Sequence, residues 1–172
     1  MHEHISAGQR ARSLHTKLSK FQDGRINFSG SGIAPVITAY VFYDGKLLLL
    51  RRSDKVGHYK LMRDAVSGYL DKIKDPVEKV LEEVQEELKI RHEDIAKVAK
   101  SKKFPFLDNN DGVEWMIAPI LIILSKSPNI KLDFENNEYA QVDPESISSH
   151  DTVAGLEIGL GDIIKLYDMA KK

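Results

Sequence analysis

Two pairs of adjacent glutamates, Glu82–Glu83 and Glu86–Glu87, lie within the stretch of residues 68–90. In a helix, side chains three and four positions apart are neighbours, so carboxylates at this spacing repel one another. On a helical wheel, Glu83, Glu86 and Glu87 share an arc of about 100°, and Glu82 lies further round. Clusters made only of oxygen ligands suit hard cations such as Mg²⁺ or Mn²⁺. The spacing therefore indicates a candidate site for a divalent cation.

A solvated helix face explains the same pattern in another way. Glutamate-rich faces are common on helices, and Lys79 lies one turn before Glu83, where the two side chains can form an ion pair. The helix itself is predicted from Asp75, a good N-cap residue, and from Pro76 in the first turn. Its apolar residues form one stripe that we expect to be buried: Val77, Val80, Leu81, Val84 and Leu88.

The segment that leads into this helix resembles a ligand-binding turn. Gly68 precedes the helix and follows the apolar pair Ala65 and Val66, which can end a strand. A strand–loop–helix unit whose backbone groups point past the helix end is a common way to hold a phosphate-bearing ligand. We therefore expect Gly68 to lie in a loop beside the acidic helix.

The rest of the chain predicts a sheet with helices beside it. Apolar segments at residues 34–43 and 46–52 flank Asp44 and Gly45, a pair typical of a two-residue type I′ hairpin. Their near-continuous apolarity is typical of strands covered on both faces. Further elements are expected at residues 113–124 (strand), 134–142 (strand) and 160–170 (an amphipathic closing helix). Hairpins and long crossovers together indicate the α/β or α+β class with a mixed sheet.

Composition narrows the class of protein. With 172 residues, 42% of them hydrophobic, the chain is long enough for one domain with a sizeable core. The 25 Lys and Arg residues nearly balance the 26 Asp and Glu residues, so no overall charge attracts nucleic acid or an anionic membrane. The sequence contains no cysteine, which excludes disulfides, thiolate metal sites and cysteine nucleophiles.

The apolar runs and the N-terminal segment bear on location. The longest apolar run, residues 116–124, is far shorter than the roughly 20 residues that a membrane span needs. Residues 1–20 contain no apolar stretch of the kind found in secretory signals, so we expect a cytoplasmic location. Residues 1–30 are predicted to form a polar arm rather than a metal site. This arm carries three of the six histidines: His2, His4 and His15.

Residues 68–90 also resemble the signature of the Nudix hydrolase family. That signature reads Gly, five residues, Glu, seven residues, Arg-Glu, an aliphatic residue, any residue, Glu-Glu, any residue, Gly and a final aliphatic residue. The positions that match, at every interval, are Gly68, Glu83, Val84, Glu86, Glu87 and Ile90. Three positions depart: Lys74 replaces the first Glu, Glu82 the Arg and Lys89 the second Gly. The wider resemblance covers residues 34–170.

Two of the departures are consistent with a single exchange of charge. In the family pattern the first Glu and the Arg have opposite charges and are understood to pair across the junction of loop and helix. In this chain the positive and negative partners are exchanged, as Lys74 and Glu82. A reciprocal exchange keeps a stabilising ion pair, although lysine lacks the planar fork with which arginine holds a carboxylate. We therefore expect Lys74 and Glu82 to form a structural pair.

The resemblance implies a fold and a site. The fold is a Nudix-like α/β/α sandwich with a mixed β-sheet, expected over residues 31–172. The cofactor is Mg²⁺ or Mn²⁺, and the implied ligands are Glu83, Glu86 and Glu87. Glu83 and Glu87 are the implied catalytic carboxylates on the helix.

Other parts of the implied site lie outside the helix. A further acidic residue is expected to act as ligand or base, with Glu135 the first choice and Glu138 the second. Arg51 and Arg52 end the hairpin, and one of them is expected to reach a phosphate, although strand alternation alone does not say which. The aromatic residues of this region are assigned to the core rather than to stacking on a base: Tyr69, Phe104, Phe106 and Trp115.

The activity implied by the resemblance is that of a metal-dependent pyrophosphohydrolase. Such an enzyme cleaves the diphosphate linkage of a nucleoside diphosphate linked to another moiety. Its partner is a small nucleotide rather than a nucleic acid or a membrane, and many relatives form homodimers. The alternative is a non-catalytic Nudix-fold module that holds a nucleotide or a protein partner, which the three departures favour. Isoprenyl diphosphate isomerisation is excluded, because the relative that performs it relies on a cysteine.

Overall fold

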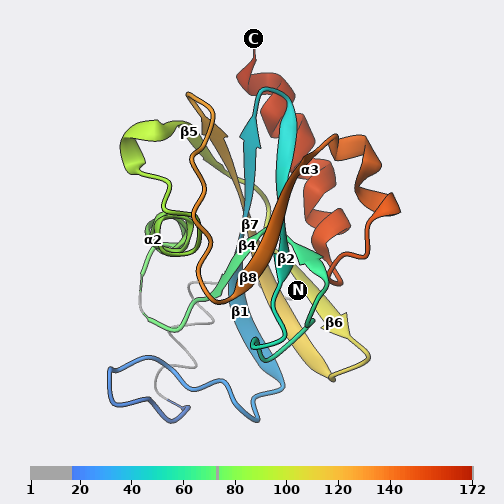
Figure 1. Cartoon of the computed structure of the whole chain (residues 1–172). Coiled ribbons are helices and arrows are strands. Elements are labelled where there is room, and N and C mark those ends of the chain that lie inside the picture. Colours follow the sequence, from blue (N-terminus) through green and yellow to red (C-terminus); the bar gives the residue numbers. More distant parts are fainter. Residues whose placement is uncertain (1–16, 73, 172) are drawn as a thin grey trace.

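The computed structural model describes residues 17–72 and 74–171 and contains a mixed sheet between helices (Figure 1). The strands of the sheet are β1 (Ile33–Tyr43), β2 (Lys46–Arg52), β3 (Arg63–Asp64), β4 (Val66–Tyr69), β5 (Ile95–Lys100), β6 (Phe104–Asp108), β7 (Val113–Leu124) and β8 (Asn136–Val142). The helices are α2 (Pro76–Leu88), α3 (Leu156–Ala170) and the short 3₁₀ helices η1 (His92–Asp94) and η2 (Pro144–Ser149).

The sheet is mixed, as predicted. Its main path runs β3-β2-β1-β7-β5, with β4 paired to β1, β6 to β7 and β8 to β2. The central pair, β1 and β7, is parallel, and the pairs around it are antiparallel. The helix α2 covers one face of the sheet and α3 covers the other (Figure 1). The predicted α/β/α sandwich is therefore confirmed.

The first strand has a core on both of its faces, which explains its near-continuous apolarity. Ile37, Ala39 and Val41 belong to the cluster that packs under α2. Tyr40 and Phe42 belong to the cluster that packs under α3. Because successive side chains of a strand point to opposite faces, a strand between two helical layers needs apolar residues at almost every position.

The hairpin between β1 and β2 has the predicted turn. Asp44 and Gly45 both have positive φ angles, 47° and 78°. A type I′ turn requires φ above zero at both central residues, which Gly and Asp tolerate better than most residues. The flanking residues Tyr43 and Lys46 pair directly across the hairpin.

The acidic helix α2 begins as its sequence predicts, but of its predicted stripe Val77 and Leu81 are only half-buried. The carboxylate of the N-cap residue Asp75 accepts a hydrogen bond from the backbone N–H of Val77 at 2.8 Å. Val80, Val84 and Leu88 are fully buried against the sheet. Burial of this stripe leaves the glutamates on the remaining faces of the helix, some of them toward the sheet edge and some toward solvent.

The closing helix begins at Leu156 rather than at Leu160, the predicted start. The hydroxyl of Tyr40 donates a hydrogen bond to the carbonyl oxygen of Leu156 at 2.7 Å, across the buried interface with the sheet. A side chain at Gly159 would place its Cβ 2.3 Å from that hydroxyl, so the glycine is required by close approach. Glycines weaken a helical pattern, and the first turn of α3 was therefore missed.

The N-terminal segment joins the domain before residue 31. Ile26 is buried, and its backbone N–H donates to the carbonyl oxygen of Asp71 at 2.7 Å. The histidines at positions 2, 4 and 15 lie outside the described residues. Within residues 17–72 and 74–171, no helix is both long and apolar enough to cross a membrane.

Candidate active site

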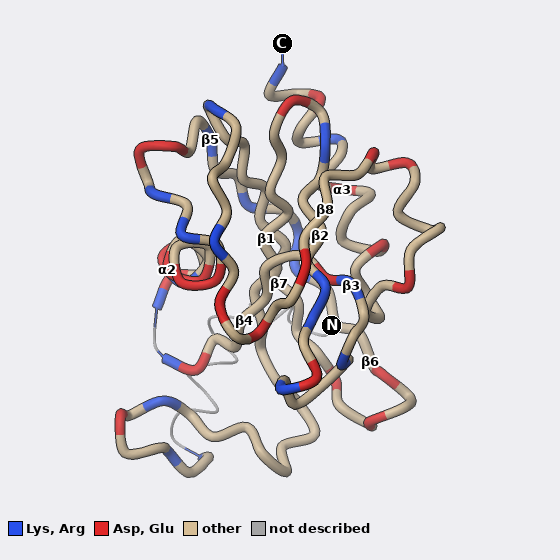
Figure 2. The backbone as a smooth tube through the Cα atoms, viewed as in Figure 1, with Lys and Arg blue, Asp and Glu red and all other residues tan. Residues whose placement is uncertain are grey.

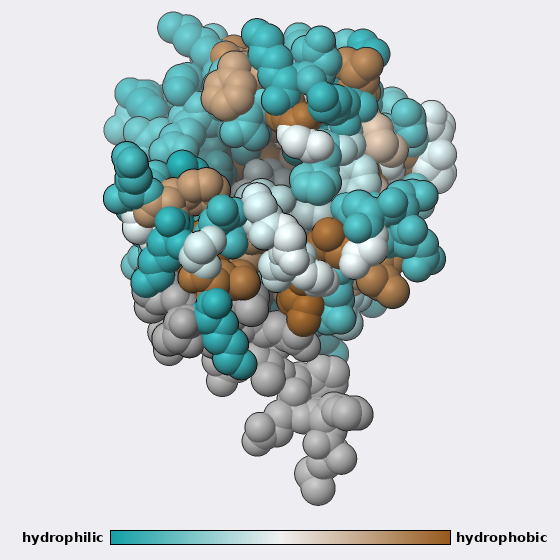
Figure 3. Space-filling model, turned by 90° about the horizontal axis from the view of Figure 1, so that it is seen from below, coloured by the Kyte–Doolittle hydropathy of each residue, from teal (hydrophilic) through white to brown (hydrophobic). Residues whose placement is uncertain are grey.

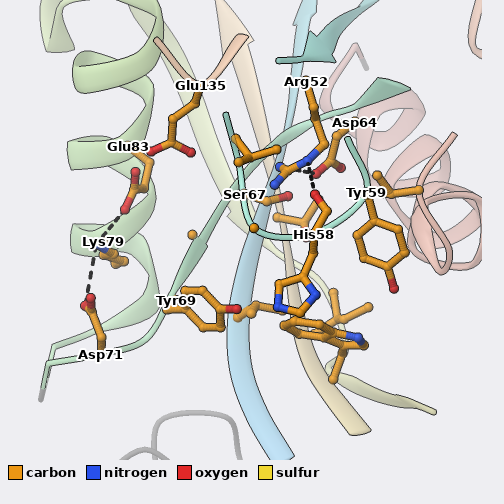
Figure 4. Close-up of a pocket in the computed structure, with 18 of the residues that line it drawn as sticks. Arg52, His58, Tyr59, Asp64, Ser67, Tyr69, Asp71, Lys79, Glu83 and Glu135 are labelled. Carbon is orange, nitrogen blue, oxygen red and sulfur yellow. Dashed lines mark hydrogen bonds and ion pairs between the residues drawn. The ribbon is translucent and has the colours of Figure 1, made fainter. Parts of the chain in front are cut away.

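A cleft of about 740 Å³ lies between α2 and the neighbouring ends of β2 and β4 (Figure 4). The side chains that give it its chemistry come from four segments: Glu82, Glu83, Glu86 and Lys79 on α2, Arg52 on β2, Tyr69 on β4 and Glu135 before β8. In Figure 4, Glu83, Glu135 and Lys79 lie on the side of α2, and Arg52 lies across the cleft from them, beside Asp64. Acidic and basic groups therefore face one another across a single cavity.

Gly68, expected from the sequence to lie in a loop, is instead part of strand β4, where it pairs with Ile37 and lies against the acidic helix. A Cβ at this position would be 2.6 Å from Oε1 of Glu83 and 2.7 Å from its Cδ. Real side chains do not approach so closely, so any other residue would displace the carboxyl group of Glu83. The glycine of the motif is thus explained by the room that it leaves for this glutamate.

Glu83 forms an ion pair with Lys79 inside the cleft. Nζ of Lys79 is 2.5 Å from Oε1 of Glu83 and 3.7 Å from Oδ1 of Asp71, and all three side chains are at most 15% exposed (Figure 4). Burial alone would lower the pKa of Lys79, but the hydrogen bond with Glu83 and the charge of Asp71 outweigh it and leave the pKa raised. The pKa of Glu83 is nevertheless raised, because burial and the charges of Glu86 and Glu135 together outweigh the effect of Lys79.

Glu87 is almost completely buried beside the loop that precedes β8. It is 4% exposed, and its Oε2 accepts a hydrogen bond from Nδ2 of Asn136 at 2.7 Å. Its Oε1 is buried without a hydrogen-bond partner. Burial, together with the charge of Glu135, raises the pKa of Glu87 to about 9. A buried carboxyl oxygen without a donor is costly unless a proton or a cation satisfies it.

Glu86 and Glu135 bring two further carboxylates to the same region. Glu86 is exposed on α2, and Glu135 is half-buried at the entry to β8. Burial raises the pKa of Glu135, and the charges of Asp133 and Glu86 raise it further. Figure 2 shows acidic segments of α2 and of the loop before β8 facing each other. Carboxylates that repel one another in this way favour the binding of a cation.

The carboxylates do not form a ready-made metal site in this arrangement. Across residues 17–72 and 74–171, no three His, Asp or Glu side chains converge closely enough to hold an ion. Two of the predicted ligands already have partners: Glu83 is paired with Lys79, and Glu87 accepts from Asn136. The predicted ligand set is thus brought into one region without being assembled around a common point.

The two arginines of the hairpin point to opposite faces. Arg52 lines the cleft, where its Nη1 is 3.4 Å from Oδ2 of Asp64 and its Nε donates to the carbonyl oxygen of His58 at 3.1 Å. Arg51 lies outside the cleft and is 3.6 Å from Glu138. Of the two, Arg52 is therefore the one placed to meet a ligand in the cleft.

The two candidate acids outside the helix, Glu135 and Glu138, lie in different places. Glu135 lines the cleft, whereas Glu138 is exposed and pairs with Arg63 and Arg51 on neighbouring strands. A register shift in the pairing of β2 with β8 accounts for part of this separation, because Arg51 pairs with Glu138 but Arg52 pairs with Asn136. Such a bulge changes the direction in which the following side chains point.

Lys74 and Glu82 form an ion pair across the junction of loop and helix. The hydrogen bond from Lys74 is the main cause of a lowered pKa at Glu82. The Glu82 side chain is 45% exposed, so solvent screens the pair and its contribution to stability is small. Its position holds the loop to the second turn of α2.

Several residues that line the cleft were not singled out in the sequence. His58 and Asp64 lie in or after the irregular stretch that follows β2 and offered no periodic signal. Tyr69, which we had assigned to the core, is 36% exposed and lines the cleft, whereas Trp115 is 8% exposed. The rings of Tyr69 and Trp115 lie 6.0 Å apart, and His58 meets Trp115 edge-on at 5.5 Å. The cleft therefore has an aromatic wall.

The face of the molecule seen from below has a mixed character. Seen from below, hydrophobic side chains form separate small patches between hydrophilic ones (Figure 3). Such scattered patches are ordinary for a protein surface, and a flat apolar ligand gains most where aromatic rings lie in a cleft.

Comparisons with solved structures identify the fold. A MutT Nudix hydrolase from Burkholderia pseudomallei is 17% identical, with a TM-score of 0.64 over 76% of this chain and 98% of that one. The chain has the Nudix fold. An Ap4A hydrolase from C. elegans is 14% identical, with a TM-score of 0.64 over 79% of this chain and 98% of its own. The E. coli dihydroneopterin triphosphate pyrophosphohydrolase is also 14% identical, with a TM-score of 0.64 over 76% of this chain and 95% of its own.

Comparison of sequences gives no match, in contrast to comparison of structures. No family model and no curated protein matches the chain. The Nudix fold nevertheless gives the motif residues a consistent setting, because the helix that carries them lies on one face of the mixed sheet and borders the cleft. The degenerate motif is therefore consistent with the Nudix fold.

Proposed function

We propose that this protein is a Nudix-type pyrophosphohydrolase that cleaves the diphosphate linkage of a nucleoside diphosphate linked to another moiety. The observation that supports it most strongly is the cleft in which Glu83 and Glu135 lie opposite Arg52 and which Glu86 also lines. Hydrolysis of a diphosphate requires acidic groups that bind cations and a basic group that binds phosphate.

A divalent cation fits the chemistry of the donors. All of them are carboxylate oxygens, which suit Mg²⁺ or Mn²⁺, and Oε1 of Glu87 is buried without a hydrogen-bond partner. Glu83, Glu86 and Glu87 would hold the cation, as the motif implies. When bound, such a cation neutralises the charge that develops on phosphate and makes water easier to deprotonate.

The remaining residues bind, orient and move a proton. Arg52, held by Asp64, binds a phosphate oxygen from the side opposite α2. Glu135 accepts the proton of the attacking water, a role that its raised pKa favours. Tyr69 and His58 hold the base of the nucleotide by stacking, since both lie in the cleft wall.

Hydrolysis of a panel of nucleoside diphosphate derivatives, with Mg²⁺ and with Mn²⁺, tests this proposal. We expect Glu83→Gln and Glu87→Gln to lower kcat by at least about a hundredfold, as loss of a charge-stabilising group typically does. Glu78→Gln removes a charge from the exposed face of the same helix and serves as the matched control, with activity unchanged. If the Glu83 and Glu87 variants both fold, by circular dichroism, and still turn over like the parent, α2 does not carry the catalysis.

A non-catalytic binding module is the second candidate. The ion pair between Lys79 and Glu83 favours it, because it occupies a carboxylate that catalysis would need. Isothermal titration with Mn²⁺, alone and with a nucleoside diphosphate, separates the two. Nucleotide binding without any uptake of Mn²⁺ and without turnover would identify the binding module.

The proposed enzyme acts on a small molecule in the cytoplasm. The near balance of charge in the sequence supports a nucleotide rather than a nucleic acid as its partner. A homodimer, as in many relatives, stays a prediction that the sedimentation of the purified chain would check.

A further inference from the structure

Lys79 has no role in the proposed reaction, yet it lies in the middle of the carboxylates. It is on the first turns of α2, one turn before Glu83, and its side chain is 15% exposed. Long cationic side chains normally extend toward solvent. This one instead turns inward, to a position between carboxylates of two different segments (Figure 4).

The ammonium group of Lys79 is near carboxylates of two segments of the cleft. Its Nζ is 2.5 Å from Oε1 of Glu83, on the helix, and 3.7 Å from Oδ1 of Asp71, in the loop after β4. Oδ1 of Asp71 is buried and has no hydrogen-bond partner. The ammonium group therefore supplies positive charge to the buried carboxylate of Glu83 and, together with Arg25, whose Nη1 is 3.8 Å from Oδ2 of Asp71, to Asp71.

We propose that the Lys79 ammonium is a built-in counter-ion that occupies the cation position at Glu83 and competes there with a divalent metal. The proposal rests on the proposed function, because it takes Glu83 as a metal ligand. A metal that binds Oε1 of Glu83 must displace the ammonium, and the displaced group remains near Asp71. Lys79 thus lowers the affinity of the cleft for metal while keeping the metal-free cleft neutralised.

The ammonium group and a metal ion would compete for one oxygen atom, Oε1 of Glu83. An ammonium group within hydrogen-bond distance of a carboxylate oxygen leaves no room for a metal ion at the same lone pair. Breaking a partly buried pair to admit the metal also costs free energy, since the ammonium loses its closest partner. Replacing Lys79 by a neutral residue removes that cost and adds one uncompensated negative charge to the cleft.

Isothermal titration with Mn²⁺ tests the proposal without any substrate. Lys79→Met keeps the apolar stem but removes the charge, and we expect it to bind Mn²⁺ at least about tenfold more tightly than the parent, the equivalent of one pKa unit. Lys74→Met is the matched control, since Lys74 also pairs with a glutamate of α2, but at the more exposed edge of the cleft, where the side chain of Glu82 is 45% exposed against 13% for Glu83. We expect its Kd to stay within about twofold of the parent, as for an exposed and screened charge.

A double variant tests whether the gain in Mn²⁺ affinity arises at Glu83. Lys79→Met combined with Glu83→Gln should lose the gain in Mn²⁺ affinity, because the oxygen that the lysine released is no longer a carboxylate. Circular dichroism and urea denaturation would verify that each variant is folded.

The outcomes distinguish this proposal from the proposed function. If the parent binds Mn²⁺ and Lys79→Met binds it no more tightly, the counter-ion proposal is wrong and the metal site stands. An equal gain in Lys74→Met would show a general effect of charge and would also overturn it. If neither the parent nor Lys79→Met binds Mn²⁺, the assignment of Glu83 as a metal ligand fails, and both proposals fail with it.

Discussion

At the scale of single residues, Glu87 combines features that rarely occur together. One carboxyl oxygen accepts from Asn136, the other is buried without a partner, and burial raises the pKa to about 9. Without a metal, the group therefore carries a proton at neutral pH. A cation that binds it must release that proton, so metal affinity at this residue should rise with pH.

The raised pKa of Glu87 also predicts how stability depends on pH in the metal-free protein. The pKa is 4.5 for the free group and about 9 in the folded protein, so between these values only the folded state holds the extra proton. The free energy of unfolding must then fall as pH rises through this window. Glu87→Gln removes the ionisable group, and we expect its free energy of unfolding to fall less between pH 5 and pH 9, by at least about 1.4 kcal/mol.

Urea denaturation at a series of pH values, with a chelator present, would measure this difference. Gln at position 87 keeps an oxygen that can accept from Asn136, so the hydrogen bond of the parent is retained. Glu78→Gln is the control and should follow the parent at every pH. Parallel curves for the parent and Glu87→Gln would show that Glu87 is not held in its protonated form.

At the scale of elements, the end of α2 is the least favourable part of the motif. The C-cap residue Lys89 has a φ angle of 58°, in the left-handed region, and its N–H donates to the carbonyl oxygen of Gln85 at 3.0 Å. A residue with a Cβ costs roughly 1–2 kcal/mol in this conformation, which glycine adopts freely. The family signature has glycine at this place, so the structure explains that preference.

We expect Lys89→Gly to raise the free energy of unfolding by about 1 kcal/mol, because it relieves the left-handed backbone. Lys89→Ala is the matched comparison, since it removes the same side chain but keeps the Cβ. It should therefore give no comparable gain. Thermal and urea denaturation of both variants would measure the effect, and an equal gain in the two would assign it to the lost side chain instead of the backbone.

At the scale of the whole molecule, the cleft exists only in the folded chain. Its carboxylates come from α2 and from the loop before β8, segments that lie far apart in the sequence and are held together by the sheet. A ligand that binds only the folded state stabilises it by mass action. Metal binding should therefore be visible as a change in stability as well as in activity.

We expect Mn²⁺ to raise the melting temperature of the parent protein. At a concentration 100 times the Kd, the gain in free energy of unfolding is about 2.7 kcal/mol. Glu83→Gln and Glu87→Gln should lose most of this gain, and Glu78→Gln should keep it. Calorimetry with Mn²⁺ and with chelator would provide the measurement, and an identical shift in all variants would place the ion elsewhere.

Much of the fold could be predicted because it depends on local patterns. The type I′ hairpin at Asp44 and Gly45 follows from the φ angles that these residues tolerate, and α2 follows from the N-cap Asp75 and its apolar stripe. The predicted long strand at residues 113–124 coincides with β7. The start of α3 was not predicted, because Gly159 weakens the helical pattern. Its role is to leave room for the hydroxyl of Tyr40, which is distant in the sequence.

The sequence by itself determined the candidate glutamates, through their spacing on one helix, and the class of fold, through the period of its apolar residues. Only the tertiary structure decided that Arg52 and Glu135 enter the cleft while Arg51 and Glu138 do not. The physical reason is that the direction of a side chain on a strand depends on which face the helix covers and on a bulge between β2 and β8. The sequence also could not decide whether the side chain of Lys79 extends into solvent or pairs with Glu83 inside the cleft. Only the packing of the folded chain decides this.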